Sequence, residues 1–85
     1  MPTAATVTLL SKPDCHLCDD AREIVRAVVA SNPRVTLTEL SITDDPALAE
    51  RYAEEIPVVM INGRVHNIWR VNPERLTAAL LEATQ

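Results

Sequence analysis

The sequence predicts a single α/β domain with a mixed four-stranded sheet and helices on both faces. Two observations lead to this prediction. Short apolar stretches alternate as strands do, and other stretches repeat apolar residues every three or four positions, as helices do. They follow one another in the order β-α-β-α-β-β-α within 85 residues, a length that suits one domain. The first β-α-β unit should be parallel and right-handed, and a later hairpin should add two antiparallel strands.

The first half of the chain should contain a strand, a helix and a second strand. The first strand is expected at about residues 6–10, after a flexible tail over residues 1–5 of the single domain 1–85. The helix follows, and Ser31-Asn32-Pro33 should end it at about Ala30. A second strand is expected over about residues 35–40. The apolar face of the helix is formed by Leu17, Ala21, Ile24, Val25, Val28 and Val29.

The second half should contain a short helix, a hairpin and a final helix. Asp45-Pro46 is typical of a helix N-terminus, and this helix should end near Glu54. A strand over residues 56–61 leads directly to Asn62-Gly63, which predicts a type I′ hairpin turn. The return strand should cover residues 64–69, and Asn72-Pro73 should start the last helix.

Composition and charge exclude several classes of function. The net charge is −4 and the pI is about 5.0, whereas nucleic-acid binding needs clustered Lys and Arg. No apolar run approaches the roughly 20 residues that span a bilayer, and the N-terminus does not have the pattern of a signal peptide. We therefore expect a cytoplasmic monomer that binds neither nucleic acid nor membrane.

Both cysteines of the chain lie in one motif, Cys15-His16-Leu17-Cys18, at the predicted junction of a strand and a helix. In a reducing compartment this spacing indicates a redox pair. The helix N-terminus and Lys12 favour a thiolate at Cys15, whereas Asp14 and the two aspartates after Cys18 oppose it. We interpret Cys15 as the nucleophile and Cys18 as the resolving thiol.

Two other interpretations of the motif stay open. As a structural staple the short loop would contribute only about 2 kcal/mol. As a metal site the pair needs further ligands to reach the four that zinc prefers. Only His16 and His66 remain as additional imidazole donors.

The order of motifs resembles the thioredoxin fold in its short glutaredoxin form. The resemblance covers about residues 6–83 and is closest to small bacterial glutaredoxin-like proteins, whose motif is similar to Ser11-Lys12-Pro13-Asp14-Cys15-His16-Leu17-Cys18-Asp19. It implies that Cys15 attacks and Cys18 resolves. It also implies that Pro57 is cis and faces the cysteines, and that the backbone of Ile56 pairs with a bound substrate.

The sequence departs from glutathione-using glutaredoxins at two places. Their Cys-Pro-Tyr-Cys is Cys15-His16-Leu17-Cys18 here, and their paired glycines and acidic dipeptide are replaced by Trp69-Arg70-Val71-Asn72-Pro73-Glu74. The chain is also similar to the redoxins that feed ribonucleotide reductase in Ser11-Lys12-Pro13 and in Pro73-Glu74-Arg75-Leu76, but lacks their Trp-Ser-Gly-Phe stretch. The resemblance therefore supports dithiol exchange more strongly than glutathione binding.

Four further side chains have a functional and a structural interpretation each. Lys12 steers an anionic group or is simply solvated, and His16 stabilises the thiolate or is simply exposed. Arg70 and Arg75 replace the missing anion site or are solvated charges.

The remaining candidates are expected to be structural. His66 should be a surface residue of the return strand, and Tyr52 and Trp69 should be packing residues. An exposed Trp69 near the cysteines would instead indicate a substrate contact.

The leading hypothesis is a thiol–disulfide oxidoreductase that acts on protein or low-molecular-weight disulfides. It would hold no organic cofactor and would receive electrons from glutathione or from a flavin reductase. The competing hypothesis is a non-catalytic thioredoxin-fold module that binds a partner or holds a metal or iron–sulfur cluster through its two thiolates.

Overall fold

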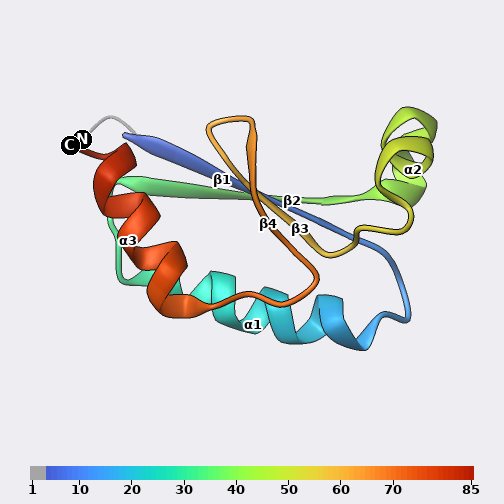
Figure 1. Cartoon of the computed structure of the whole chain (residues 1–85), viewed down its shortest axis with the longest axis horizontal. Coiled ribbons are helices and arrows are strands. Elements are labelled where there is room, and N and C mark those ends of the chain that lie inside the picture. The colour runs from blue at the N-terminus through green and yellow to red at the C-terminus, as the bar shows by residue number, and fades with distance from the viewer. Residues whose placement is uncertain (1–3) are drawn as a thin grey trace.

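The structure, a computed structural model, describes residues 4–85 and contains one four-stranded sheet in the order β2-β1-β3-β4 (Figure 1). The element order confirms the predicted β-α-β-α-β-β-α arrangement, with one additional 3₁₀ turn, η1. The elements are β1 (Ala5–Ser11), α1 (His16–Ala30), β2 (Val35–Ser41), η1 (Ile42–Asp44), α2 (Pro46–Tyr52), β3 (Val58–Ile61), β4 (Arg64–Ile68) and α3 (Pro73–Ala83).

The sheet is mixed, as the sequence predicts. β1 pairs in parallel with β2 along its whole length and antiparallel with β3, which in turn pairs antiparallel with β4. The hairpin turn between β3 and β4 has positive φ at both central residues, 52° at Asn62 and 83° at Gly63. Type I′ turns require this geometry, and Asn and Gly adopt it most readily. Because β1 pairs with both β2 and β3, it is one of the two inner strands of the sheet, and it ends just before the cysteine motif.

The two faces of the sheet have separate hydrophobic clusters, with Leu9 and Val59 in one and Leu10 and Val58 in the other. α1 and α3 lie together on one face, whereas α2 lies near one end of the sheet, apart from them (Figure 1). The first cluster joins α1 and α3 to β1, β2 and β3, and its buried members include Leu9, Val25, Val59 and Leu76. The second cluster joins α2 to the cysteine motif, and its buried members are Leu10, Cys18, Ile42, Tyr52, Ile56 and Val58. The packing prediction for Tyr52 is thus confirmed.

The predicted caps start the two later helices. The Asp45 side chain accepts a hydrogen bond of 2.9 Å from the Ala47 N–H. The Asn72 side chain accepts bonds of 2.9 and 3.1 Å from the N–H groups of Glu74 and Arg75. In both helices a proline occupies the first position, where its missing N–H leaves no bond unmade.

Several predicted boundaries differ from those of the structure. The flexible tail expected over residues 1–5 is wrong for Ala5, which is the first residue of β1 and is only 2% exposed. Residues 1–3 of that tail lie outside the described part of the chain. α2 ends at Tyr52 rather than near Glu54. β3 begins at Val58, directly after the cis Ile56–Pro57 bond, rather than at residue 56.

Within residues 4–85, no helix combines the length and the apolar composition that crossing a membrane requires.

Two leucines of α3 provide a matched test of this packing. Leu76 is 0% exposed and Leu81 is 54% exposed. We expect Leu76→Ala to lower the free energy of unfolding by about 2–5 kcal/mol, because it removes buried surface and leaves a cavity. Leu81→Ala should change it by less than about 0.5 kcal/mol. Urea unfolding followed by circular dichroism measures both, and equal losses would contradict the assignment of the core.

Candidate active site

Cys15 and Cys18 form a disulfide at the junction of β1 and α1. Their Cα atoms are 5.1 Å apart, within the usual range for a bridged pair. Residues 12–15 connect β1 to α1, so the motif lies just after the inner strand β1 and in the first turn of α1. The structure thus brings the two predicted site cysteines into direct contact.

The two sulfur atoms have different surroundings. Cys18 is 0% exposed and belongs to the second hydrophobic cluster, whereas Cys15 is only partly buried against that cluster. Cys15 is also the N-cap residue of α1, and its Sγ accepts a 3.1 Å hydrogen bond from the Cys18 N–H. An N-terminal helix turn favours negative charge at that position. The geometry therefore allows an incoming sulfur to reach Cys15 and places any negative charge there.

The cis proline predicted from the resemblance is present. The Ile56–Pro57 peptide bond is cis, Ile56 is 7% exposed, and Pro57 is almost fully buried. Ile56 belongs to the same hydrophobic cluster as Cys18, and Cys15 packs against this cluster. The structure thus gathers Cys15, Cys18 and the Ile56–Pro57 segment at one end of the sheet, although they lie about 40 positions apart in the chain.

Lys12 precedes the cysteine motif and His16 lies within it, and the side chains of both are free of polar partners among the described residues. Both residues are exposed, and within residues 4–85 neither side chain has a hydrogen bond or ion pair. Asp14, between them, has a φ of 58°, in the left-handed region that Asp and Asn tolerate better than most residues. Asp14 therefore has a conformational role in the turn that leads to Cys15.

A network of charged side chains ties the first turns of α1 to the sheet. Arg22 Nε lies 3.1 Å from Glu39 Oε1 on β2, and Arg22 Nη1 lies 2.9 Å from Asp19 Oδ1. Arg22 Nη2 also donates to the Oγ of the buried Ser11, at 3.4 Å. Arg26 donates to both oxygens of Glu39, at 2.8 and 3.0 Å. This network fixes the cysteine-bearing end of α1 against β1 and β2.

Trp69 is not a packing residue, so that prediction is wrong. It is 53% exposed and has a φ of 66°, because the chain turns sharply between the end of β4 and the cap of α3. Its backbone N–H donates to the Pro57 carbonyl at 2.8 Å, and its Nε1 donates to the Glu54 carbonyl at 3.1 Å. Trp69 is therefore attached to the loop that carries the cis proline.

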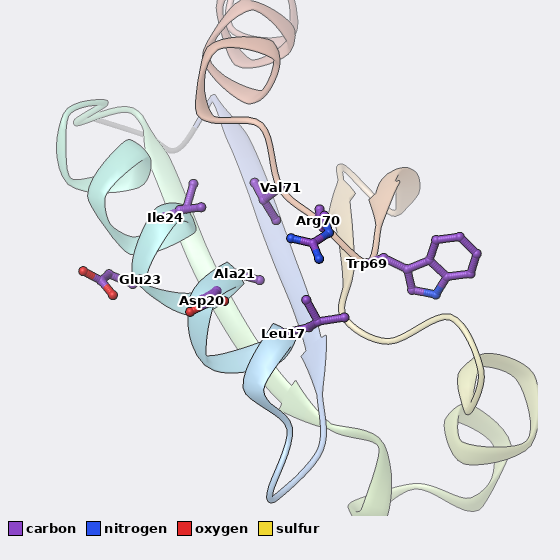
Figure 2. Close-up of a pocket in the computed structure, with 8 residues that line it drawn as sticks. All are labelled: Leu17, Asp20, Ala21, Glu23, Ile24, Trp69, Arg70 and Val71. Carbon is purple, nitrogen blue, oxygen red and sulfur yellow. The ribbon is translucent and has the colours of Figure 1, made fainter.

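A cleft of about 470 Å³ lies between α1 and residues 69–71. Figure 2 shows Leu17, which lies between the two cysteines in the sequence, pointing from α1 toward this segment. The lining residues are Leu17, Asp20, Ala21, Glu23, Ile24, Trp69, Arg70 and Val71. The exposed Trp69 therefore lines the same cleft as Leu17 of the cysteine motif, and a position near the motif is what would indicate a substrate contact.

The two arginines considered for an anion site differ in location. Arg70 lines the cleft, and its guanidinium points toward α1 (Figure 2); within residues 4–85 it forms no ion pair. Arg75 does not line the cleft. It lies near His66 on β4, where burial first and the charge of Arg75 second lower the pKa of His66. Only Arg70 is thus placed at the site.

Metal binding through the cysteines has no additional ligands in the described residues. Within residues 4–85, no three His, Cys, Asp or Glu side chains are grouped as a metal site requires. His16, at the start of α1, and His66, in β4, therefore do not join the cysteines in such a group among these residues.

Comparison with known proteins identifies similar sequences and structures. The sequence model of the glutaredoxin-like domain (DUF836) matches residues 6–81. The uncharacterized protein Rv0508 of Mycobacterium tuberculosis is 26% identical over 82 residues, which are 92% of this chain and 84% of that protein. The solved structure of the structural-genomics target XcR50 from X. campestris is 34% identical and has a TM-score of 0.67, with 89% of this chain and 96% of that chain covered.

Thioredoxins share the fold at lower sequence identity. A mutant thioredoxin from Halobacterium salinarum is 14% identical with a TM-score of 0.74, covering 98% of this chain and 77% of that chain. Oxidized mitochondrial thioredoxin 3 from Saccharomyces cerevisiae is 14% identical with a TM-score of 0.71, covering 94% and 79%. At this identity the similarity supports the thioredoxin-like fold alone.

The charged network should make stability depend on pH. The Arg26 hydrogen bond is the main cause that holds the pKa of Glu39 below its ordinary value of 4.5. The folded protein therefore binds this proton less readily than the unfolded chain, and the stabilisation is lost as the pH falls through the folded-state pKa. We expect Glu39→Gln to cost about 1 kcal/mol or less at pH 7, and this cost should decrease as the pH falls through the folded-state pKa of Glu39.

Thermal unfolding between pH 3 and pH 7 measures this difference. Glu82→Gln is the control, because Glu82 is an exposed residue of α3 without an ion pair among the described residues. A cost for Glu39→Gln that is the same at pH 3 and at pH 7 would contradict the role of the network.

Proposed function

The chain belongs to the glutaredoxin-like domain family, and we propose that it is a thiol–disulfide oxidoreductase that reduces disulfides of proteins or small molecules. We further propose that it works as a monomer in the reducing cytoplasm and needs no bound organic cofactor. Cys15 is the nucleophile and Cys18 the resolving thiol. Ile56 and Pro57 contact the substrate, and Lys12 and His16 form the rim of the site.

The observation that carries this proposal is the difference between the two sulfur atoms. Cys15 is partly exposed and accepts a hydrogen bond at the N-terminus of α1, whereas Cys18 is 0% exposed. A thiolate attacks a disulfide only when it can approach the sulfur directly. Cys15 can therefore meet a substrate sulfur, and Cys18 can meet only Cys15.

The reaction then follows in two balanced exchanges. The Cys15 thiolate attacks one substrate sulfur, forms a mixed disulfide and releases the other substrate sulfur as a thiolate. The Cys18 thiolate attacks Cys15 Sγ, forms the Cys15–Cys18 disulfide found in this structure and releases the second substrate thiolate. Two electrons pass from the protein to the substrate, and the protons of the two cysteines end on the substrate thiols.

Electrons for the next cycle would come from glutathione or from a flavin-dependent reductase. Either donor needs access only to Cys15 Sγ, which is the more exposed sulfur. This donor role does not require the glycine-rich site that the segment Trp69-Arg70-Val71-Asn72-Pro73 lacks.

Substitution of each cysteine tests the assignment. Cys15→Ser should abolish reduction of a disulfide substrate, because the attacking sulfur is removed. Cys18→Ser should allow the first exchange and leave a mixed disulfide on Cys15. Mass spectrometry of the products and a turnover assay with a protein disulfide measure both effects. If Cys15→Ser retains full activity, or if the adduct forms on Cys18 in Cys15→Ser at the same rate, the assignment is wrong.

A titration in glutathione redox buffers tests the electron donor. We expect oxidised glutathione to form one adduct, at Cys15, with the Cys18→Ser variant, whereas in the unaltered protein Cys18 should displace the adduct. The thiol state of the unaltered protein, read by mass across the buffer series, gives the reduction potential of the pair. If no adduct forms on Cys15 and the disulfide resists reduced glutathione, the flavin-dependent reductase is the remaining donor.

A further inference from the structure

Trp69 lines two clefts, one of which is also lined by Leu17 of the cysteine motif. The first is the cleft between α1 and residues 69–71, which we call the α1 cleft. The second, of about 510 Å³, lies between the end of α2 and Ile68–Trp69, and we call it the α2 cleft. In Figure 2 the indole points away from α1, whereas the guanidinium of Arg70 points toward it. The ring is therefore directed away from the α1 cleft, and the Arg70 guanidinium toward it.

The indole is held in place before any partner binds. Its Nε1 donates a hydrogen bond to the Glu54 carbonyl, and the backbone N–H of Trp69 donates another to the Pro57 carbonyl. The side-chain amide of Asn67 also donates to the Arg70 carbonyl, which closes the turn. Because these bonds restrict the ring in the free protein, little conformational entropy is lost when a partner packs on it. Exposed, rigid aromatic rings are typical of binding surfaces.

The charges of the α2 cleft favour a cation on the indole. Glu50, Glu54 and Glu55 line this cleft, and Arg51 is its only cation among the described residues. The Arg51 guanidinium lies 5.4 Å from the centre of the Tyr52 ring, so it is already placed over a different aromatic side chain. An ammonium or guanidinium group on the face of an indole is stabilised by the ring quadrupole, and neighbouring carboxylates add to this attraction.

The α1 cleft favours an apolar group. Leu17, Ala21, Ile24 and Val71 contribute its aliphatic surface, and its charged lining residues are one cation, Arg70, and two carboxylates, Asp20 and Glu23. A polypeptide near the disulfide can place an apolar side chain here and a basic side chain over Trp69. Glutathione, which carries two carboxylates and one ammonium group, offers neither an apolar side chain nor a net positive charge.

We propose that the preferred substrates are disulfide-bonded polypeptides that carry Lys or Arg close to the reacting cysteine, and that the basic side chain lies on Trp69 over the α2 cleft. This inference rests on the proposed function and specifies the substrate class of the same site. The exchange is the one given above, with the polypeptide disulfide reduced by two electrons and the Cys15–Cys18 dithiol oxidised. The reductant in a single turnover is the prereduced protein itself.

Two synthetic peptides with the same internal disulfide test this proposal. One carries Lys on both sides of each cysteine and the other carries Glu at those positions. The prereduced protein is mixed with each peptide, the reaction is quenched with acid, and the reduced peptide is measured by mass. We expect the Lys peptide to react at least ten times faster at low salt, and the ratio should fall toward one at 0.5 M salt because screening weakens exposed charges.

Variants identify the residues responsible. Trp69→Ala should lower the rate for the Lys peptide about five-fold or more, and Glu54→Gln/Glu55→Gln should reduce the Lys-to-Glu ratio by a similar factor. Asp44→Asn/Glu82→Gln is the matched control, because it changes the net charge equally and neither residue lines these clefts. The charge variants keep the test valid if circular dichroism shows that Trp69→Ala is unfolded.

The outcomes separate the two proposals. Equal rates for the two peptides, or a faster Glu peptide, with full dependence on Cys15 would overturn the substrate inference alone. An equal effect of both charge-pair variants would also overturn it, since only long-range charge would then matter. Reduction that does not depend on Cys15, or no reduction of either peptide, would overturn the proposed function as well.

Discussion

The hydrogen bond from the Cys18 N–H to Cys15 Sγ is the contact on which the rest of the site depends. It makes Cys15 the N-cap of α1, so the accessible sulfur receives the polarity of a whole helix. The bond forms only if α1 begins directly after the turn at Asp14, whose φ of 58° directs the chain into the helix. The side chain of Cys18 faces inward and is part of the second hydrophobic cluster.

The position of this helix end is secured by interactions of two kinds. Apolar residues of α1 pack against the sheet and α3, with Val25 0% exposed. The Arg22 and Arg26 guanidinium groups hold the polar side of the helix to Glu39 on β2. β1 and β2 pair in parallel, with Ala5 opposite Val35 at one end and Ser11 opposite Ser41 at the other. This pairing fixes Glu39 relative to the end of β1. The apolar packing and the polar contacts of Glu39 together hold α1, and with it Cys15 and Cys18, in one position on the sheet.

The sequence predicts local signals well and long-range contacts poorly. The caps at Asp45 and Asn72, the Asn62-Gly63 turn and the cysteine spacing each depend on a few adjacent residues, and the structure contains them all. The cis bond before Pro57 followed only from the family resemblance, because X–Pro bonds are usually trans. The network around Arg22 joins residues 17 positions apart and leaves no periodic pattern.

The exposure of Trp69 was not predicted from the sequence, because it depends on how the chain turns after β4. The Asn62-Gly63 turn predicted a return strand that would continue through Trp69, and a strand tryptophan is usually buried. The chain must reach the cap at Asn72 within three residues after Trp69, so β4 ends at Ile68 and the backbone turns at a positive φ. The bonds to Pro57 and Glu54 then hold the ring at the surface. Trp69 is thus attached to the loop whose Ile56 packs with the cysteines, and this attachment is the reason why we propose that a segment distant in sequence contacts the substrate.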